Sequence, residues 1–266
     1  MQKYYGQISK LESALKQTIQ YSLPIGKKNK IPLNNLIGNQ LFISFDGKIE
    51  CVACGQKIKK TFMQGYCYPC FIRLPQTSEC ILKPELCRAH EGESRDMEWS
   101  KKYCLSDQYV YLSLTSNLKV GVTRHTQIPT RWIDQGAHQA LIFAKTPNRY
   151  LAGMIEKELS THISDKTYWR RMLTGEYPNL DLLIEKNKLK EILSSKYQNF
   201  VTEDHNITSL NYPKISSPQK IRSLNLDKNP LIDLKLCGIK GQYLLFEDDY
   251  VLNIRKYTGY FLKIKF

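Results

Sequence analysis

The sequence contains no run of about 18 apolar residues, the length that a helix needs to cross a bilayer. Its first residues, MQKYYGQISKLESALKQ, lack the apolar segment typical of a secretory signal. No internal repeat or low-complexity tract is evident. These absences exclude a helical membrane protein and a repeat architecture, and we expect a cytoplasmic protein without a membrane partner.

Acidic residues are also scarce. The 266 residues include 25 acidic and 39 basic side chains, a formal net charge of +14. The excess lies at the two ends of the chain and in a cysteine-rich block between them; residues 207–266 alone carry ten basic and five acidic side chains. Such an imbalance favours a polyanionic partner, because binding releases condensed counterions. Nucleic acid, DNA or RNA, is therefore the expected partner, and a lysine-rich composition that serves only solubility is the alternative.

Cysteine is abundant, and seven of the eight cysteines lie between residues 51 and 104. Two Cys-x-x-Cys pairs are separated by twelve residues, a pattern that predicts a tetrahedral structural zinc site. Its four ligands would be Cys51, Cys54, Cys67 and Cys70. The loop between the pairs carries three lysines that could contact phosphates of a nucleic acid: Lys57, Lys59 and Lys60.

A second group of metal-binding residue types follows the first. Cys80, Cys87, His90 and Cys104 could hold a second zinc ion, since three thiolates and an imidazole complete a tetrahedral site. An iron–sulfur cluster would also accept three cysteines, although four are usual. Buried free thiols that pack as small apolar groups remain the structural alternative.

The pattern along the chain predicts an α+β protein. Residues 1–50 and 231–266 alternate apolar and polar positions, as strands do, and 204–230 is polar and rich in Pro and Ser. Neither end supplies enough strands for a closed sheet. We therefore predict three parts: a composite β domain from 1–50 plus 207–266, a cysteine-rich zinc-binding module at 51–104, and an α/β core with a helical extension at 105–200.

Within the central part the predicted order is strand, strand, helix, strand, helix. The strands are 109–115, 118–123 and 139–146, and the helices lie near 129–136 and 148–163. Asn148 is a suitable N-cap for the second helix. Two more helices are expected, one capped by Asp165 and one spanning about 179–196.

This order, together with the strand Lys119-Val120-Gly121-Val122-Thr123, resembles the core of the GIY-YIG nuclease superfamily, in the branch whose second motif reads like KIGIT. The first motif would be Tyr109-Val110-Tyr111. Arg131 follows Gly121 by ten residues, and Glu156 begins an E-x-x-L pattern, where that family has its arginine and glutamate. The chain also resembles, over nearly all its length, an uncharacterised bacterial and archaeal family of unknown function.

The resemblance implies a small mixed sheet with flanking helices and a metal-dependent nuclease. Glu156 would hold Mg²⁺ or Mn²⁺, Tyr111 would help to activate water, and Arg131 would neutralise developing charge. Arg124 and Arg149 are further expected phosphate contacts. The chain departs from the family pattern at several positions: Tyr109 replaces a glycine, and the asparagine that often follows the glutamate has no clear counterpart. Lys119 replaces the second-motif tyrosine; we expect it at that catalytic position, where a lysine could hold phosphate. A non-catalytic nucleic-acid-binding module and a protein-interaction module on a degenerate scaffold therefore remain alternatives.

Overall fold

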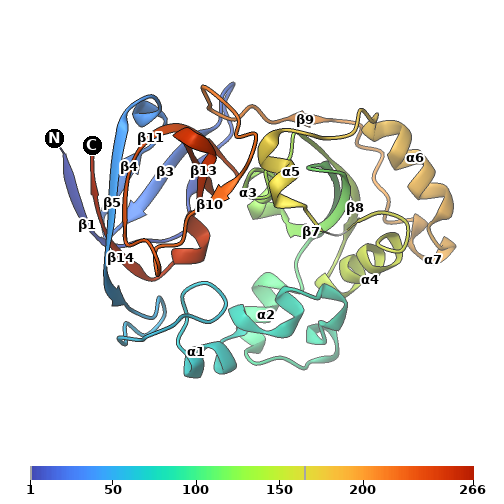
Figure 1. Cartoon of the computed structure of the whole chain (residues 1–266). Coiled ribbons are helices and arrows are strands. Elements are labelled where there is room, and N and C mark those ends of the chain that lie inside the picture. The colour runs from blue at the N-terminus through green and yellow to red at the C-terminus, as the bar shows by residue number, and fades with distance from the viewer. Residues whose placement is uncertain (1, 165) are drawn as a thin grey trace. The chain divides into compact units, whose positions relative to one another are not determined.

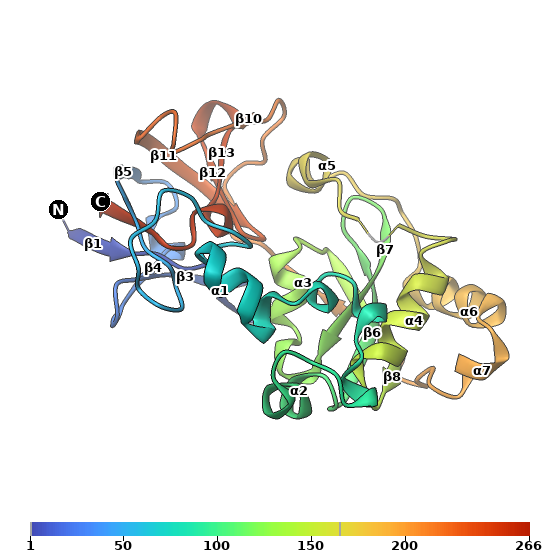
Figure 2. The same ribbon diagram turned by 90° about the horizontal axis from the view of Figure 1, so that it is seen from below.

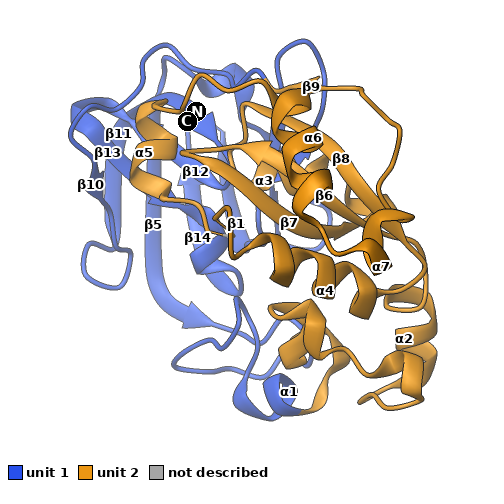
Figure 3. Ribbon diagram, turned by 90° about the vertical axis from the view of Figure 1, so that its right-hand side faces the viewer, with its two compact units in different colours: residues 1–72, 211–266 blue, residues 73–210 orange. Residues whose placement is uncertain are grey.

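The computed structural model describes residues 2–164 and 166–266. The chain has an α+β fold that forms two compact units (Figures 1, 2 and 3). Unit 1 comprises residues 1–72 and 211–266, and unit 2 comprises residues 73–210. The boundary at 72/73 divides the cysteine-rich block: both Cys-x-x-Cys pairs belong to unit 1, and the remaining cysteines of the block belong to unit 2.

Unit 1 is built on a seven-stranded sheet with the order β1-β14-β5-β11-β12-β13-β10. These strands are β1 (Lys3–Gln7), β5 (Gln40–Ile49), β10 (Arg222–Ser223), β11 (Leu231–Lys240), β12 (Tyr243–Phe246), β13 (Tyr250–Asn253) and β14 (Tyr260–Lys265). A separate three-stranded sheet contains β2 (Glu12–Ala14), β3 (Gln20–Ile25) and β4 (Asn29–Pro32). One short helix, α1 (Tyr68–Arg73), begins directly after Cys67 and contains Cys70.

The strands from the two ends of the sequence depend on each other for burial. Ile43 in β5 pairs with Ile264 in β14 and with Ile232 in β11, and all three side chains are buried. Alternate residues of a strand face opposite sides of a sheet, so the alternation in the sequence places one apolar face inward. Strands β1 and β14, near the two termini, run antiparallel side by side.

Unit 2 contains a four-stranded sheet with the order β7-β6-β8-β9. Its strands are β6 (Gln108–Leu114), β7 (Leu118–Arg124), β8 (Gln139–Thr146) and β9 (Thr208–Ser209). The helices are α2 (Met97–Tyr103), α3 (Thr130–Asp134), α4 (Arg149–Leu159), α5 (Trp169–Thr174), α6 (Leu182–Ile192) and α7 (Ser195–Gln198). The order β6-β7-α3-β8-α4 is the one that the sequence predicts.

Helices α4 and α6 cover one face of this sheet. Val110, Leu112 and Val120 point from the strands into a core that also contains Ile155 and Leu159 of α4. The predicted cap of α4 is confirmed, because Asn148 Oδ1 accepts a hydrogen bond of 2.9 Å from Leu151 N–H. The opposite face carries Tyr111, whose ring lies edge-on to Trp132 of α3 with centroids 6.2 Å apart.

Several boundaries differ from the predicted ones. The helix expected over 179–196 is two helices, α6 and α7, because Leu193 adopts an extended conformation between them. Asp165, the predicted cap of the preceding helix, lies outside the described residues. Helix α5 instead begins at Trp169, with Tyr168 at the N-cap position and no side-chain cap. Among the described residues the longest helices have 11 residues, and no helix is long and apolar enough to span a bilayer.

The core of unit 2 makes a stability prediction. Ile155→Ala removes a fully buried side chain from the interface between α4 and the sheet, and it should lower the free energy of unfolding by about 2–5 kcal/mol. Ile184→Ala is the matched control, because Ile184 also lies on a helix but is 54% exposed, and it should change stability by less than about 0.5 kcal/mol. Urea unfolding followed by circular dichroism measures both, and equal effects would contradict the assignment of the core.

Candidate metal centre and candidate active site

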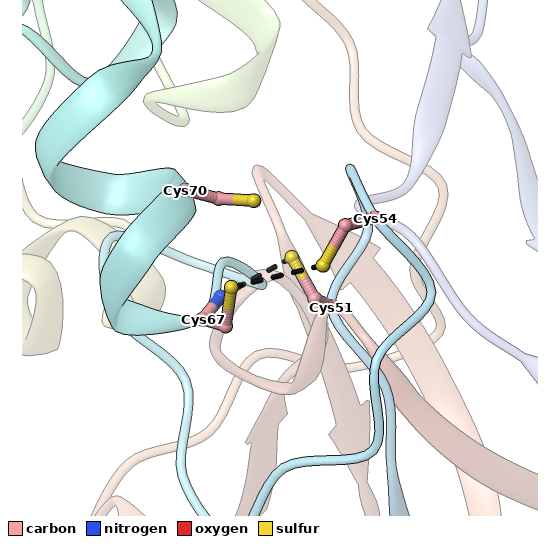
Figure 4. A group of neighbouring side chains, drawn as sticks. All are labelled: Cys51, Cys54, Cys67 and Cys70. Atoms are coloured by element: carbon pink, nitrogen blue, oxygen red, sulfur yellow. Dashed lines mark hydrogen bonds between the residues drawn. The ribbon is translucent and has the colours of Figure 1, made fainter.

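Unit 1 gathers four cysteines from two short segments. Cys51 and Cys54 occupy the turn after β5, while Cys67 and Cys70 lie immediately before and within the first turn of α1 (Figure 4). The four sulfur atoms all lie within 4.8 Å of one another, and the Cys54 and Cys67 sulfurs are 3.7 Å apart. Tetrahedral zinc with Zn–S bonds of about 2.3 Å requires sulfurs about 3.8 Å apart. The donor set and its spacing therefore fit a structural zinc ion.

The backbone around Cys51 favours the thiolate that zinc requires. Cys67 N–H donates to the Cys51 sulfur over 3.2 Å. Burial disfavours the Cys51 thiolate, but N–H groups of Cys54, Cys67 and Ala53 outweigh it and lower the pKa of Cys51 to about 6. Hydrogen bonds to the charged form are the general cause of such a shift. A metal ion at this centre would bind with little cost in deprotonating that ligand.

The lysines between the two pairs are exposed: Lys57, Lys59 and Lys60. Lys60 lines a hollow of about 420 Å³ in unit 1 together with Arg255 and Lys256. Arg255 Nε donates to Gln64 Oε1 over 2.5 Å, which ties the arginine to the loop between the pairs. The two C-terminal cations were not predicted, since nothing in their local sequence indicates that they lie beside residue 60.

Unit 2 contains a second hollow, of about 250 Å³, with an unusual charge arrangement. Three arginines and one glutamate line it: Arg124, Arg131, Arg149 and Glu156. Arg124 ends β7, Arg131 lies on α3, and the other two lie on α4 at positions 149 and 156, two helical turns apart. All four side chains are half-buried. Burial and the neighbouring Arg149 charge lower the pKa of Arg124.

Tyr111 lies beside this hollow and is fully buried. Its hydroxyl donates to Gln135 Oε1 over 2.8 Å and is also hydrogen-bonded with Arg131. Burial raises the pKa of Tyr111, and the charge of Glu156 raises it further, against the opposing effect of Arg131. The phenol is therefore a neutral hydrogen-bonding group at neutral pH. The charges of Arg131 and Glu156 both act on the Tyr111 hydroxyl.

Glycine at position 121 is required by this tyrosine. Tyr111 and Gly121 are direct cross-strand partners, and a Cβ atom at position 121 would overlap the Tyr111 ring. Lys119 lies two residues earlier on the same face of β7, opposite Ser113, and is 8% exposed. Among the described residues that line the arginine hollow, Lys119 is absent. The catalytic role expected of Lys119 stays a prediction.

Arg149 is held by the segment that precedes the sheet. Its guanidinium donates to the carbonyl oxygens of Cys80 over 2.8 Å and Ile81 over 3.0 Å. Its backbone N–H donates to Cys104 O over 2.8 Å. One turn later, the backbone of Pro84 and Glu85 lies so close to Gly153 that a Cβ atom there would overlap it. The cysteine-rich segment thus forms one wall of the hollow.

That wall contributes aromatic side chains that the sequence pattern did not single out. Trp99 and Tyr103 of α2 line the hollow, and their ring centroids are 4.7 Å apart. The Arg124 guanidinium lies 4.6 Å from the Tyr103 ring centroid, a cation–π contact. The two residues are 21 positions apart on different elements, so local periodicity carries no signal for this pairing.

The second predicted metal group is only partly assembled. Cys80 and Cys104 both hydrogen-bond to Cys87, and the three line one hollow in unit 2. The His90 ring instead stacks on Tyr150 with centroids 4.4 Å apart. Within the described residues, only the four cysteines of unit 1 form a group whose metal-ligating atoms all lie within 4.8 Å of one another.

Fold and site together define an α+β protein with a four-cysteine cluster suited to a metal ion in unit 1 and an arginine-lined hollow in unit 2. A family model described as "Protein of unknown function (DUF2797)" matches residues 38–262, and the chain belongs to this family. That match confirms the resemblance to a family of unknown function. Comparisons with curated proteins and with solved structures found no match.

If the four cysteines bind zinc, replacing one of them should release that ion. Cys54→Ser should reduce the zinc content of the purified chain by about one equivalent and should destabilise unit 1, because binding energy at a structural zinc contributes directly to folding. Cys237→Ser is the control, since Cys237 lies in the same unit outside the cluster and its thiol donates to Lys235 O. Elemental analysis gives the measurement, and an unchanged zinc content in Cys54→Ser would refute the centre.

Proposed function

We propose that this chain binds nucleic acid and that the arginine-lined hollow of unit 2 is a phosphodiesterase site assisted by a divalent cation. One observation carries the proposal: Arg124, Arg131, Arg149 and Glu156, from three separate elements, line the same hollow. Three guanidinium groups against one carboxylate favour a ligand with concentrated negative charge. Guanidinium groups also match the geometry of phosphate oxygens.

The order β6-β7-α3-β8-α4 and the positions of Arg131 and Glu156 are consistent with the resemblance to the GIY-YIG nuclease superfamily. Among the described residues lining the hollow, Glu156 is the one carboxylate. A single carboxylate suits Mg²⁺ or Mn²⁺, because such ions keep several waters and accept phosphate oxygens as ligands. When bound, such an ion would supply Lewis-acid activation of the phosphate and a more acidic water.

The chain's own residues have distinct roles in this proposal. Arg124 and Arg131 contact the phosphate and offset the charge that builds up on its oxygens during cleavage. Arg149, held by two backbone carbonyls, fixes the side of the hollow nearest the cysteine-rich segment. Tyr111 is a positioning residue: its raised pKa keeps the phenol protonated, so it orients Arg131 and does not remove a proton from water.

A non-catalytic nucleic-acid-binding role is the second candidate. The observation that favours it is the hollow in unit 1, where Lys60, Arg255 and Lys256 gather beside the loop of the metal centre. No acidic side chain is among the described residues that line this hollow. Such a surface would bind phosphates without any group suited to cleaving them. The free thiols and the zinc centre agree with a reducing, cytoplasmic location, which is also part of the proposal.

Cleavage tests the catalytic part of the proposal. The wild-type chain should cut DNA or RNA in the presence of Mg²⁺ or Mn²⁺, and Glu156→Gln should reduce the rate by about 100-fold or more, because it removes the proposed cation ligand. Glu98→Gln is the matched control on α2, where the side chain is 84% exposed and pairs with Lys101. Cleavage that is equal in Glu156→Gln and wild type would remove the assignment, and binding without any cleavage would favour the non-catalytic role.

Binding tests the arginines independently of catalysis. Arg124→Ala and Arg131→Ala should each weaken binding of a labelled oligonucleotide by about tenfold or more, because hydrogen bonds to charged groups contribute about 1.5–3 kcal/mol. Each lost phosphate contact should also reduce the slope of log affinity against log salt by about 0.7–0.9. Arg171→Ala provides the control, since that arginine is exposed on α5 beside Glu176. Fluorescence anisotropy across a salt series makes the comparison, and identical slopes would argue against phosphate contact.

A further inference from the structure

Unit 2 contains a hollow of about 290 Å³ onto which three cysteines converge. Cys80 lies in a 3-10 turn (Glu79–Ile81), Cys87 follows the turn Pro84–Leu86, and Cys104 is the C-cap of α2. The three residues span 80–104 in the sequence, yet they belong to one small cluster with Ala89. No part of the four-cysteine centre belongs to this cluster, since that centre lies in unit 1.

Cys87 is the central member of the trio. Its sulfur is hydrogen-bonded with the thiols of both Cys80 and Cys104, and the Ala89 N–H is directed at the same sulfur. The spacing is wider than in unit 1, because the three sulfurs are not all within 4.8 Å of one another. Cys87 therefore links the other two cysteines, and all three line the hollow.

The surrounding segment has little apolar core of its own. Residues 73–96 contain four 3-10 turns of three residues each, and one seven-residue helix follows. Apart from the cysteines, the buried residues of these elements are small: Pro75, Thr77, Pro84, Ala89 and Ser100. Segments that cannot build an apolar core generally require disulfides or a metal ion. A disulfide would use two of the three thiols and would leave the third unexplained.

We propose that Cys80, Cys87 and Cys104 bind one zinc ion as three thiolates, with a fourth position that opens onto the 290 Å³ hollow. Soft thiolate ligands select zinc over Mg²⁺ or Ca²⁺. Three protein ligands plus an open position distinguish a site that can exchange its fourth ligand from a closed structural site. His90 is not assigned as the fourth ligand, because its ring is stacked on Tyr150. Metal binding would draw Cys80 or Cys104 slightly inward.

The trio is linked to the arginine hollow through the backbone. The carbonyls of Cys80 and Cys104, two of the three ligand residues, accept hydrogen bonds from Arg149. An ion at the trio therefore fixes two of the three backbone carbonyls that hold Arg149. The effect of this link on activity rests on the proposed function, whereas the proposal of a metal site is independent of that function.

Metal stoichiometry tests the site on the full chain. The wild-type protein, purified with a thiol reductant, should contain two zinc ions per chain. The double variant Cys87→Ser/Cys104→Ser should contain one, Cys54→Ser should contain one, and Cys237→Ser should still contain two. One zinc in wild type with none in Cys54→Ser would overturn the proposal, as would iron with acid-labile sulfide in place of the second zinc. If the wild type contains one zinc ion per chain and its cleavage depends on Glu156, the metal site of the trio is refuted and the proposed function is not.

Absorption spectroscopy with Co²⁺ tests the site even where a variant folds poorly. Cys54→Ser reconstituted with Co²⁺ should show thiolate-to-cobalt charge-transfer absorption from the remaining trio, and its absence would count against the site. His90→Ala should retain two zinc ions, whereas loss of one would overturn the open fourth position.

Hydrogen exchange on wild type provides the last measurement. As chelator is added, amide exchange in residues 80–105 should increase at the chelator concentration that releases the second equivalent of zinc. Unchanged exchange would contradict the proposal that a metal ion holds this segment.

Discussion

The cross-strand pair between Tyr111 and Gly121 is the contact on which the arrangement of the arginine hollow depends. The tyrosine ring lies across strand β7 at the one position where the strand has no side chain, and any Cβ atom there would overlap it. From this position the hydroxyl reaches Gln135 and Arg131. The pair thus joins the sheet to α3, and it explains why a glycine and a tyrosine occur together in these two strands.

A second constraint comes from a segment with almost no regular structure. The backbone at Pro84 and Glu85 lies against Gly153, and the carbonyls of Cys80, Ile81 and Cys104 accept hydrogen bonds from Arg149. Helix α4 is therefore held from the sheet side by its apolar residues and from the other side by this segment. The position of Arg149 in the hollow therefore depends on the stability of the cysteine-rich segment.

Much of the local structure followed from the sequence because it depends on short-range spacing. The two Cys-x-x-Cys pairs, the Asn148 cap and the apolar stripe of α4 each involve residues at most four positions apart within an element or turn. The positions of Arg131 and Glu156 followed from a motif, and both line the same hollow. Lys119 lies five residues before Arg124 on β7, and it is not among the described residues that line the hollow.

The sequence by itself determined the four-cysteine centre, the order of strands and helices in unit 2, and the basic balance of the chain, since these depend on neighbours along the backbone. Only the tertiary structure decided that residues 73–104 belong with the sheet of unit 2 and not with the zinc pairs. It also decided that Arg149 bonds to residues about 70 positions earlier, that Tyr103 stacks with Arg124, and that Arg255 lies beside Lys60. Such contacts arise from packing between distant segments, and no periodicity along the chain encodes them.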